Sequence, residues 1–325
     1  MSHVPTLQPR APEEGAPALG DAAAARPGRH PFAEFWVRLV REKPLGAFGG
    51  ALCLLMLLVA LSADLIAPQG YNAIDPLRRL QPPSAEAWFG TDQLGRDLFA
   101  RIVHGARLSV VVAFAAASLS IVISALIGIV SGYLGGRVDM AMQRVVDSWM
   151  IFPDLVFLLL LVSVAGPGTG TVIFSLALVF GVTGSRIVRA QVLSVKENAY
   201  VKAAQSIGAS TRRILLTHIL PNVMPILVVL FALRLGAVIL YEATLSFIGM
   251  GIPPPQPAWG GMLNVEGRTF MFRAPWLTIF PSAALVILVF GINMFGDAVR
   301  DLIDPRMRGS GGRYGGRVRR RKGSK

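Results

Sequence analysis

The sequence predicts an all-α integral membrane protein in which six transmembrane helices form the main domain. Of its 325 residues, 53% are hydrophobic and only 16% are charged, and the mean hydropathy is +0.55. This chain is therefore more apolar than an ordinary soluble domain. Six segments come close to the roughly 20 apolar residues that a helix needs to cross a bilayer. They are residues 45–67, 107–134, 143–165, 171–192, 222–248 and 277–298.

The net charge of +13 could suggest nucleic-acid binding, but the basic residues lie between and after the apolar segments. We therefore expect the lipid bilayer, and no nucleic acid, as the partner of these charges. The one cysteine, Cys53, lies inside the first apolar segment, so a disulfide framework within the chain is excluded.

The two ends of the chain differ from its apolar middle. Residues 1–30 are rich in Pro, Ala and Gly and predict a disordered cytoplasmic tail. Residues 31–44 predict an amphipathic helix in the membrane interface. Residues 45–306 hold the six-helix transmembrane domain, and the Gly- and Arg-rich residues 307–325 predict a basic, disordered cytoplasmic tail. The apolar face of the interfacial helix would consist of Phe32, Phe35, Trp36, Leu39 and Val40.

The distribution of Lys and Arg predicts the orientation of the chain in the membrane. With the N-terminus inside, the inner segments hold 24 of the 32 basic residues. Basic residues concentrate on the cytoplasmic side of membrane proteins. Both termini, and the polar segment 194–225 between the fourth and fifth apolar segments, are therefore expected in the cytoplasm of a multi-pass cell-membrane protein.

Segment 194–225 predicts a helical hairpin. Gly208 can end a first helix in the left-handed conformation, and Ser210 can cap a second helix over residues 211–218. Pro221 and Pro225 are expected to end that helix. The first helix would carry small and apolar side chains on one face, namely Tyr200, Ala203, Ala204 and Ile207. The hairpin could pack on its own bundle or present this face to another protein.

This hairpin resembles the EAA loop of ATP-binding-cassette importer permeases. The matching residues are Ala203 and Ala204, Gly208 after them, and Leu220 with Pro221 further on. In that family the loop docks into a groove of the cytoplasmic ATPase. Lys202 stands where the motif has Glu, and His218 where it usually has Ile. The resemblance assigns ATPase coupling to Tyr200, Lys202, Ala203, Ala204, Gly208, Ala209, Ser210, His218, Leu220 and Pro221.

Motifs outside the hairpin narrow the resemblance to the dipeptide/oligopeptide/nickel branch of these permeases, and within it to the C-type subunit. They are GTDQLGRD at 90–97, LSFIGMGIPPPQPAWG at 245–260, FPSA at 280–283 and INMFGDAVRDLIDPR at 292–306. Thr91 or Asp92 is expected to cap the helix that leads into the second span. The prolines at 253–257 exclude a helix there. Tryptophans 88, 259 and 276 are expected at the outer headgroup level.

The resemblance implies the transmembrane permease subunit of an ATP-driven peptide importer. Its partners would be a second permease, two ATP-binding subunits and an extracytoplasmic substrate-binding protein. A nickel-chelate, glutathione or other small-solute permease of the same branch stays open as an alternative. Secondary transport without ATPases is disfavoured because no inverted repeat or broken midplane helix is evident.

Three ionisable residues inside the apolar segments are candidates for the translocation pathway, because charges at bilayer depth are costly and usually functional. Asp154 is expected near the middle of the third span and Arg234 near the middle of the fifth. The two would be paired or border the substrate path, or lie beside a wetted cavity without a direct role. Glu242 lies two turns beyond Arg234 and could line a gate.

The sequence gives no sign of catalysis by this chain. It has no Gly-x-x-x-x-Gly-Lys-Ser/Thr loop for nucleotide phosphates and no Gly-x-Ser-x-Gly nucleophile elbow. Its four histidines, His3, His30, His104 and His218, are scattered and lack the spacing of metal ligands. We therefore expect no cofactor, no metal and no enzymatic activity of its own.

Overall fold

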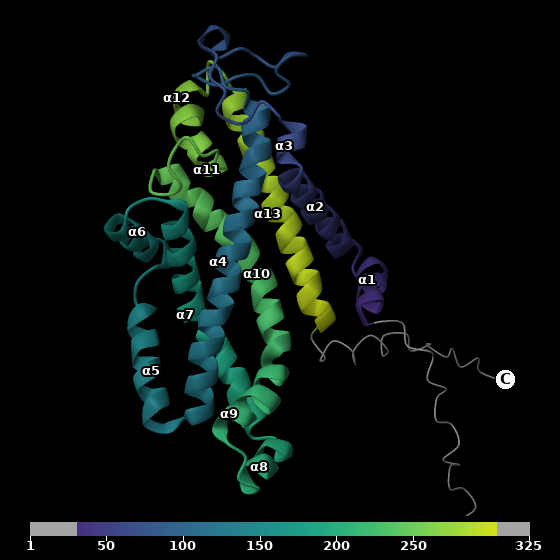
Figure 1. The fold of residues 1–325 in the computed structure, drawn as a ribbon, viewed down its shortest axis with the longest axis vertical. Helices are drawn as coiled ribbons and strands as arrows, with labels where there is room; N and C mark the ends of the chain where they lie inside the picture. Colours follow the sequence, from purple (N-terminus) through teal and green to yellow (C-terminus); the bar gives the residue numbers. More distant parts are fainter. Residues whose placement is uncertain (1–30, 304–325) are drawn as a thin grey trace, which may run out of the picture.

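A computed structural model describes residues 31–303 of the chain, apart from the side chains of 31–34 and 265. The predicted tails, 1–30 and 307–325, lie outside the described residues. Figure 1 shows long helices running roughly parallel to the long axis of the molecule. Within the described part the helices long and apolar enough to cross a membrane are α2 (Pro44–Leu61), α4 (Leu98–Leu134), α7 (Thr169–Lys196), the run Thr211–Ile248 that contains α10 (Leu220–Ile248), and α13 (Trp276–Ile303).

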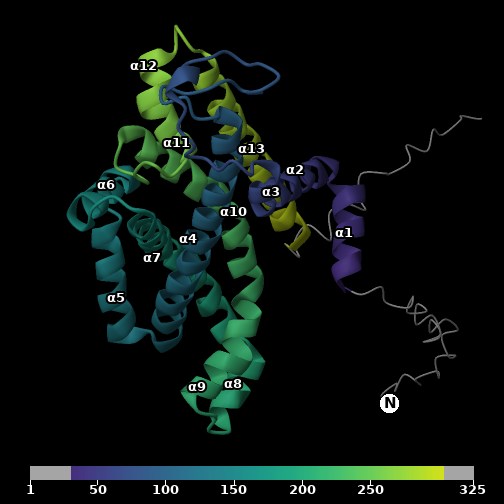
Figure 2. The same cartoon turned by 45° about the horizontal axis from the view of Figure 1, so that its top comes forward.

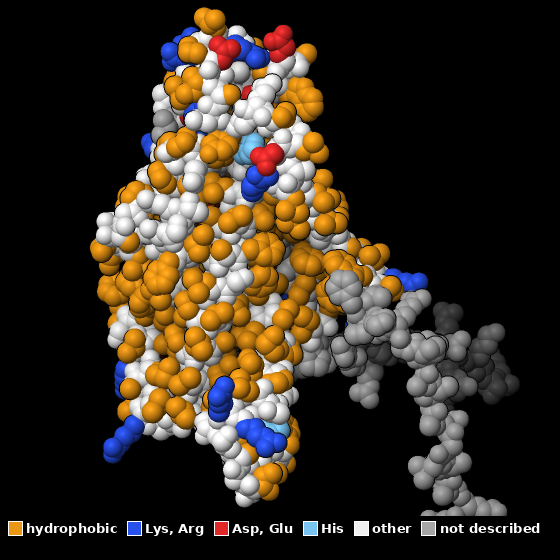
Figure 3. Space-filling model, viewed as in Figure 1, with side chains coloured by type: hydrophobic (Ala, Val, Ile, Leu, Met, Phe, Trp, Pro, Cys, Tyr) orange, Lys and Arg blue, Asp and Glu red, His pale blue; other side chains and the backbone are white. Residues whose placement is uncertain are grey.

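On the face shown in Figure 3 a wide band of apolar side chains covers these helices, and most Lys, Arg, Asp and Glu side chains lie toward the two ends. An apolar belt between polar ends matches the surface of a protein that crosses a bilayer. The all-α membrane architecture predicted from the sequence is confirmed.

The third predicted span is wrong as a single straight helix. Residues 143–165 fall on α5 (Gly136–Trp149) and α6 (Asp154–Ala165), which are bent by 88° at the break between them. Pro153 explains the break, because a proline disfavours helical geometry in the residue before it. Asp154 is consequently the first residue of α6, at the break of a bent pair that together is long and apolar enough to be one span.

The centre of the bundle depends on the close approach of α4 and α7. A Cβ atom added at Gly128 of α4 would lie 2.7 Å from the Ser185 carbonyl oxygen of α7. The Ser124 hydroxyl donates to the Gly181 carbonyl oxygen at 2.8 Å. Small residues let the two backbones pack closely, which is how helices associate in a membrane without a hydrophobic driving force.

The helix predicted at 31–44 is present as α1 (Pro31–Glu42), which continues almost directly into α2. Leu39 is 1% exposed and packs against Ala298 and Leu302 of α13. The Lys43 ammonium lies 2.6 Å from an Asp301 carboxylate oxygen. Figure 2 shows α1 beside the bundle. Its place in the membrane interface stays a prediction.

Two long connections form a compact region at one end of the molecule, which we call the loop layer: residues 68–97 and 249–275. It contains η1 (Pro76–Arg78), α11 (Trp259–Met262), η3 (Leu263–Gly267) and α12 (Arg268–Phe270). The prolines at 253–257 lie outside any helix, as predicted. α4 is capped by Asp97, which accepts from the backbone N–H groups of Phe99 and Ala100, and not by Thr91 or Asp92.

The headgroup position predicted for Trp259 is also wrong. This side chain is 1% exposed, and its indole N–H donates to the Ile102 carbonyl oxygen at 3.1 Å. The Trp276 indole donates to the Thr91 carbonyl oxygen at 3.2 Å. Trp88, by contrast, is 65% exposed. Trp259 therefore joins the loop layer to α4, and Trp276 joins it to α13.

Four buried charges hold the two halves of the loop layer together. Asp92 and Glu266 alternate with Arg96 and Arg101, and every one of these side chains is at most 6% exposed. The Asp92 carboxylate lies 2.6 Å from both arginines, and one Glu266 oxygen lies 2.9 Å from both. Burial raises the pKa of Glu266, although Arg101 and Arg96 oppose that shift. We call these residues the charge quartet.

Removing one acid of the charge quartet should destabilise the protein strongly, because two buried guanidinium groups lose a partner. We expect Asp92→Asn to cost about 3–5 kcal/mol and to lower the melting temperature of the purified protein. Asp64→Asn is the matched control, since Asp64 pairs with Arg107 at 2.9 Å but is 76% exposed. Equal melting temperatures for the two variants would contradict a stabilising role for the quartet.

Candidate coupling hairpin and intramembrane charge site

The predicted hairpin lies at the end of the molecule opposite the loop layer (Figure 1). It consists of α8 (Ala199–Ser206) and α9 (Thr211–Ile214). Gly208 has a φ of 77°, the left-handed conformation that glycine adopts at little cost. The Ser210 hydroxyl accepts from the Arg213 backbone N–H at 3.4 Å. Both predicted helix boundaries are confirmed.

The predicted apolar face of the first helix does not lie on one side. Val201 is fully buried and Ala204 is 7% exposed, and both pack in one cluster with Ile214. Tyr200 and Ile207 are 43% and 84% exposed, and Ala203 is exposed with them. The buried face differs from the predicted one because residues 201 and 204, which are three apart, lie on the same side of α8, and this side packs against the bundle. Ala204 therefore packs inward, while its neighbours face outward.

Polar contacts also fix the hairpin to the bundle. The Lys196 ammonium donates to the Tyr133 carbonyl oxygen at 2.6 Å and lies 5.5 Å from the centre of the Tyr133 ring. The Gln205 amide donates to the Tyr133 hydroxyl at 3.4 Å. Tyr133 is at the end of α4, so α4, α7 and α8 meet at this one side chain.

The remaining predicted coupling residues make separate contacts. Lys202 pairs with Glu197 at 2.8 Å on the surface. The His218 ring lies 6.0 Å from the Tyr200 ring. Ala209 and Leu220 pack partly buried against the cluster of Val201 and Ala204, whereas Pro221 is exposed.

The second helix does not end at the prolines, which corrects the expected break. α9 continues through a π-helical turn, η2 (Leu215–Ile219), into α10, so residues 211–248 form one helical run. The π-turn changes the hydrogen-bonding register just before Pro221, which therefore occupies the first turn of α10, where a missing N–H is tolerated. The hairpin is thus joined to the bundle without a flexible link.

Arg234 is the central residue of the 29-residue α10. Its guanidinium carbon lies 4.8 Å from the centre of the Phe180 ring, and one guanidinium nitrogen lies 3.5 Å from the Thr183 hydroxyl. Tyr241 meets Phe180 edge to face at 5.2 Å. Arg234 is half-buried, so part of this residue reaches the surface of the chain.

Asp154 does not form the predicted ion pair with Arg234: within residues 31–303 no carboxylate lies within 4 Å of that guanidinium. The two groups are close enough to interact electrostatically. Glu242 is 2% exposed and accepts a hydrogen bond from the Ser246 hydroxyl at 2.8 Å. Its own chain encloses it, which argues against a position at an open gate.

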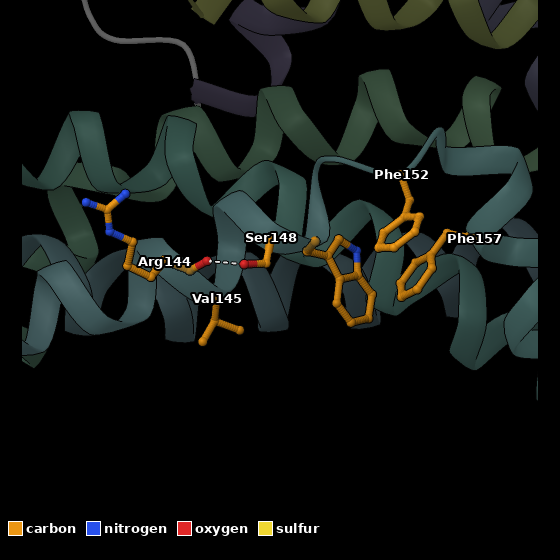
Figure 4. Close-up of a pocket in the computed structure, with 6 residues that line it drawn as sticks. Arg144, Val145, Ser148, Phe152 and Phe157 are labelled. Atoms are coloured by element: carbon orange, nitrogen blue, oxygen red, sulfur yellow. Dashed lines mark hydrogen bonds between the residues drawn. The ribbon is translucent and has the colours of Figure 1, made fainter.

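The break between α5 and α6 leaves an apolar groove of about 400 Å³ on the side of the bundle. Figure 4 shows Phe152 and Phe157 side by side at one end and Arg144 at the other, where Ser148 donates to the Arg144 carbonyl oxygen. The groove holds no titratable side chain apart from Arg144 at its rim.

Sequence reasoning missed the charge quartet and the side chains around Arg234. Asp92 and Arg96 stand four residues apart, a spacing that could have indicated a pair, but Glu266 is 170 residues from Arg96. Phe180, Thr183 and Tyr241 belong to apolar spans, and their sequence pattern does not distinguish them from other packing residues.

Known proteins with similar sequences have the same kind of membrane-spanning fold. Residues 124–309 match the family model described as binding-protein-dependent transport system inner membrane component. Residues 30–83 match the N-terminal TM domain of oligopeptide transport permease C. The chain is 36% identical over 298 residues to the dipeptide transport system permease protein DppC of Alkalihalophilus pseudofirmus, covering 91% of this chain and 96% of that protein.

A second relative and a solved structure extend the comparison. The oligopeptide transport system permease protein OppC of Bacillus subtilis is 38% identical over 268 residues, covering 82% of this chain and 88% of that protein. A structure of the MetNI methionine ABC transporter in inward-facing conformations superposes with a TM-score of 0.51 at 18% identity, covering 63% of this chain and 96% of the compared chain. At that identity the likeness shows the fold alone. The family match and the two relatives show that this chain belongs to the inner-membrane permease components of binding-protein-dependent transport systems.

Proposed function

We propose that this chain is a permease subunit of an ATP-driven importer of dipeptides or oligopeptides. It would form half of the translocation pathway, together with a second permease of the same fold. Two separate ATP-binding subunits would hydrolyse the nucleotide, and an extracytoplasmic binding protein would deliver the peptide. The names and lengths of the relatives support the substrate class, since this chain covers 96% of a dipeptide permease and 88% of an oligopeptide permease.

The main support for this proposal is that one face of the hairpin helix α8 is buried against the bundle while the opposite face is exposed. Val201 and Ala204 bury the inner face of α8 against the bundle, while the outer face presents Ile207 at 84% exposure. An isolated apolar side chain this exposed at the tip of a rigid element suits a pocket on a partner protein. The outer face would dock on an ATPase through Tyr200, Ala203 and Ile207, and the buried face would pass ATPase movement to the spans.

The other residues assigned by resemblance would support this docking without filling the pocket. Gly208, Ala209 and Ser210 would set the turn, and Lys202, His218, Leu220 and Pro221 would flank it. Residues 31–44 would lie in the membrane interface, residues 45–306 would form the permease domain, and segment 194–225 would be its coupling loop.

We expect Ile207→Asp to abolish peptide-dependent ATP hydrolysis and uptake by the complete transporter in proteoliposomes. The melting temperature of the isolated permease should stay unchanged, since the side chain is 84% exposed. Ile207→Leu is the matched control and should keep most of both activities, because it retains an apolar contact. Normal ATP-driven uptake by Ile207→Asp would contradict docking at this side chain.

The proposed orientation puts the hairpin and both termini in the cytoplasm and the loop layer outside. We expect Ser206→Cys, on a background of Cys53→Ala, to react with a membrane-impermeant maleimide only in inverted membrane vesicles. Ala85→Cys in the loop layer should react only in right-side-out cells, since both positions are exposed. The reverse labelling pattern would place the hairpin out of reach of any cytoplasmic ATPase.

A further inference from the structure

Arg234 presents an unusual combination for a residue in the centre of a membrane-spanning helix. It is a permanent positive charge, it is only half-buried, and no carboxylate within residues 31–303 lies within 4 Å of it. A charge at this depth normally faces a partner charge or a water-filled cavity. In this chain alone the guanidinium therefore lacks an anionic partner among the described residues.

The side chains around Arg234 are suited to hold it in place and leave one side open. The Phe180 ring, 2% exposed, lies 4.8 Å from the guanidinium carbon and supports it by a cation–π contact. Thr183 is at the edge of hydrogen-bond distance, at 3.5 Å. Neither group is anionic, so both orient the guanidinium without neutralising it.

Tyr241 adds a second donor beside the same ring. It stands two helical turns along α10 from Arg234 and meets Phe180 edge to face. Its hydroxyl makes no hydrogen bond to the part of the chain that the structure describes. A guanidinium and a phenol that contact the same ring are both donors of the kind that a carboxylate accepts.

Asp154 is the negative charge that interacts with Arg234, but it does not form an ion pair with the guanidinium. The 88° bend between α5 and α6 brings the first residue of α6 within electrostatic reach of Arg234 and Tyr241, but not into an ion pair. Two opposite charges that interact without forming an ion pair can each bind one end of a zwitterion.

We propose that Arg234, oriented by Phe180 and Thr183 and assisted by Tyr241, binds the terminal carboxylate of the peptide as it crosses the membrane. This inference rests on the proposed function, since it names the part of the substrate that the pathway recognises. It makes Arg234 a specificity-determining residue and not a structural one.

The test uses the complete transporter in proteoliposomes and two labelled peptides of one sequence, one with a free terminal carboxylate and one with a terminal amide. The uptake of each peptide is divided by the measured fraction of binding protein that the peptide occupies. This ratio removes any preference that the binding protein itself has for one of the two peptides. We expect the wild type to favour the carboxylate about tenfold, the size of one charged hydrogen bond. Arg234→Gln should bring that ratio close to one, and Arg234→Lys should keep part of it.

Arg144→Gln is the matched control, because it removes the same charge from an exposed position on α5, and it should retain the wild-type ratio. The proposal is overturned if Arg234→Gln lowers uptake of both peptides by the same factor. It is also overturned if that variant loses the second permease on size-exclusion chromatography, since Arg234 would then pair with a carboxylate of the partner. A wild-type transporter that imports neither peptide would instead refute the proposed function.

Discussion

Burial of the inner face of the hairpin against the bundle is the contact on which the rest of this structure depends. Val201, Ala204 and Ile214 are at most 7% exposed and share one cluster with residues of α4, α7 and α10. Separating the hairpin from the bundle would expose this apolar surface, at about 25 cal/mol for each Å². The hairpin must therefore move together with the spans, which is what a mechanical link to an ATPase requires.

The helical run of residues 211–248 connects the hairpin to the opposite end of the molecule. Its 38 residues span about 57 Å at 1.5 Å per residue, from the hairpin to the loop layer. Arg234 lies within it, and at its far end the Ser246 hydroxyl joins Glu242 to the backbone N–H of Ile252. The hairpin, the intramembrane charge and the loop layer thus belong to one continuous element, with a π-turn and not a hinge at Pro221.

Features determined by local chemistry were predictable from the sequence, and features determined by tertiary packing were not. Gly208 and Ser210 define the hairpin because a left-handed glycine and a capping hydroxyl act within a few residues. The inward direction of Ala204 depends on where the bundle lies relative to α8. The break before Asp154 and the partnership of Glu266 with Arg96 likewise require positions in space that apolar periodicity does not contain.

The charge quartet and Arg234 differ in how their charges are compensated. In the charge quartet two acids meet two arginines within 2.9 Å, at the end of the bundle, and every side chain is nearly inaccessible. Each charge of the quartet has an oppositely charged partner, and such an arrangement favours one conformation of the loop layer. Arg234 lies in the middle of a span, with an aromatic ring and a hydroxyl in place of an acid. Because an arginine at that depth needs an anion or water, its incomplete shell is consistent with the proposed binding of a substrate carboxylate, a group that arrives and leaves.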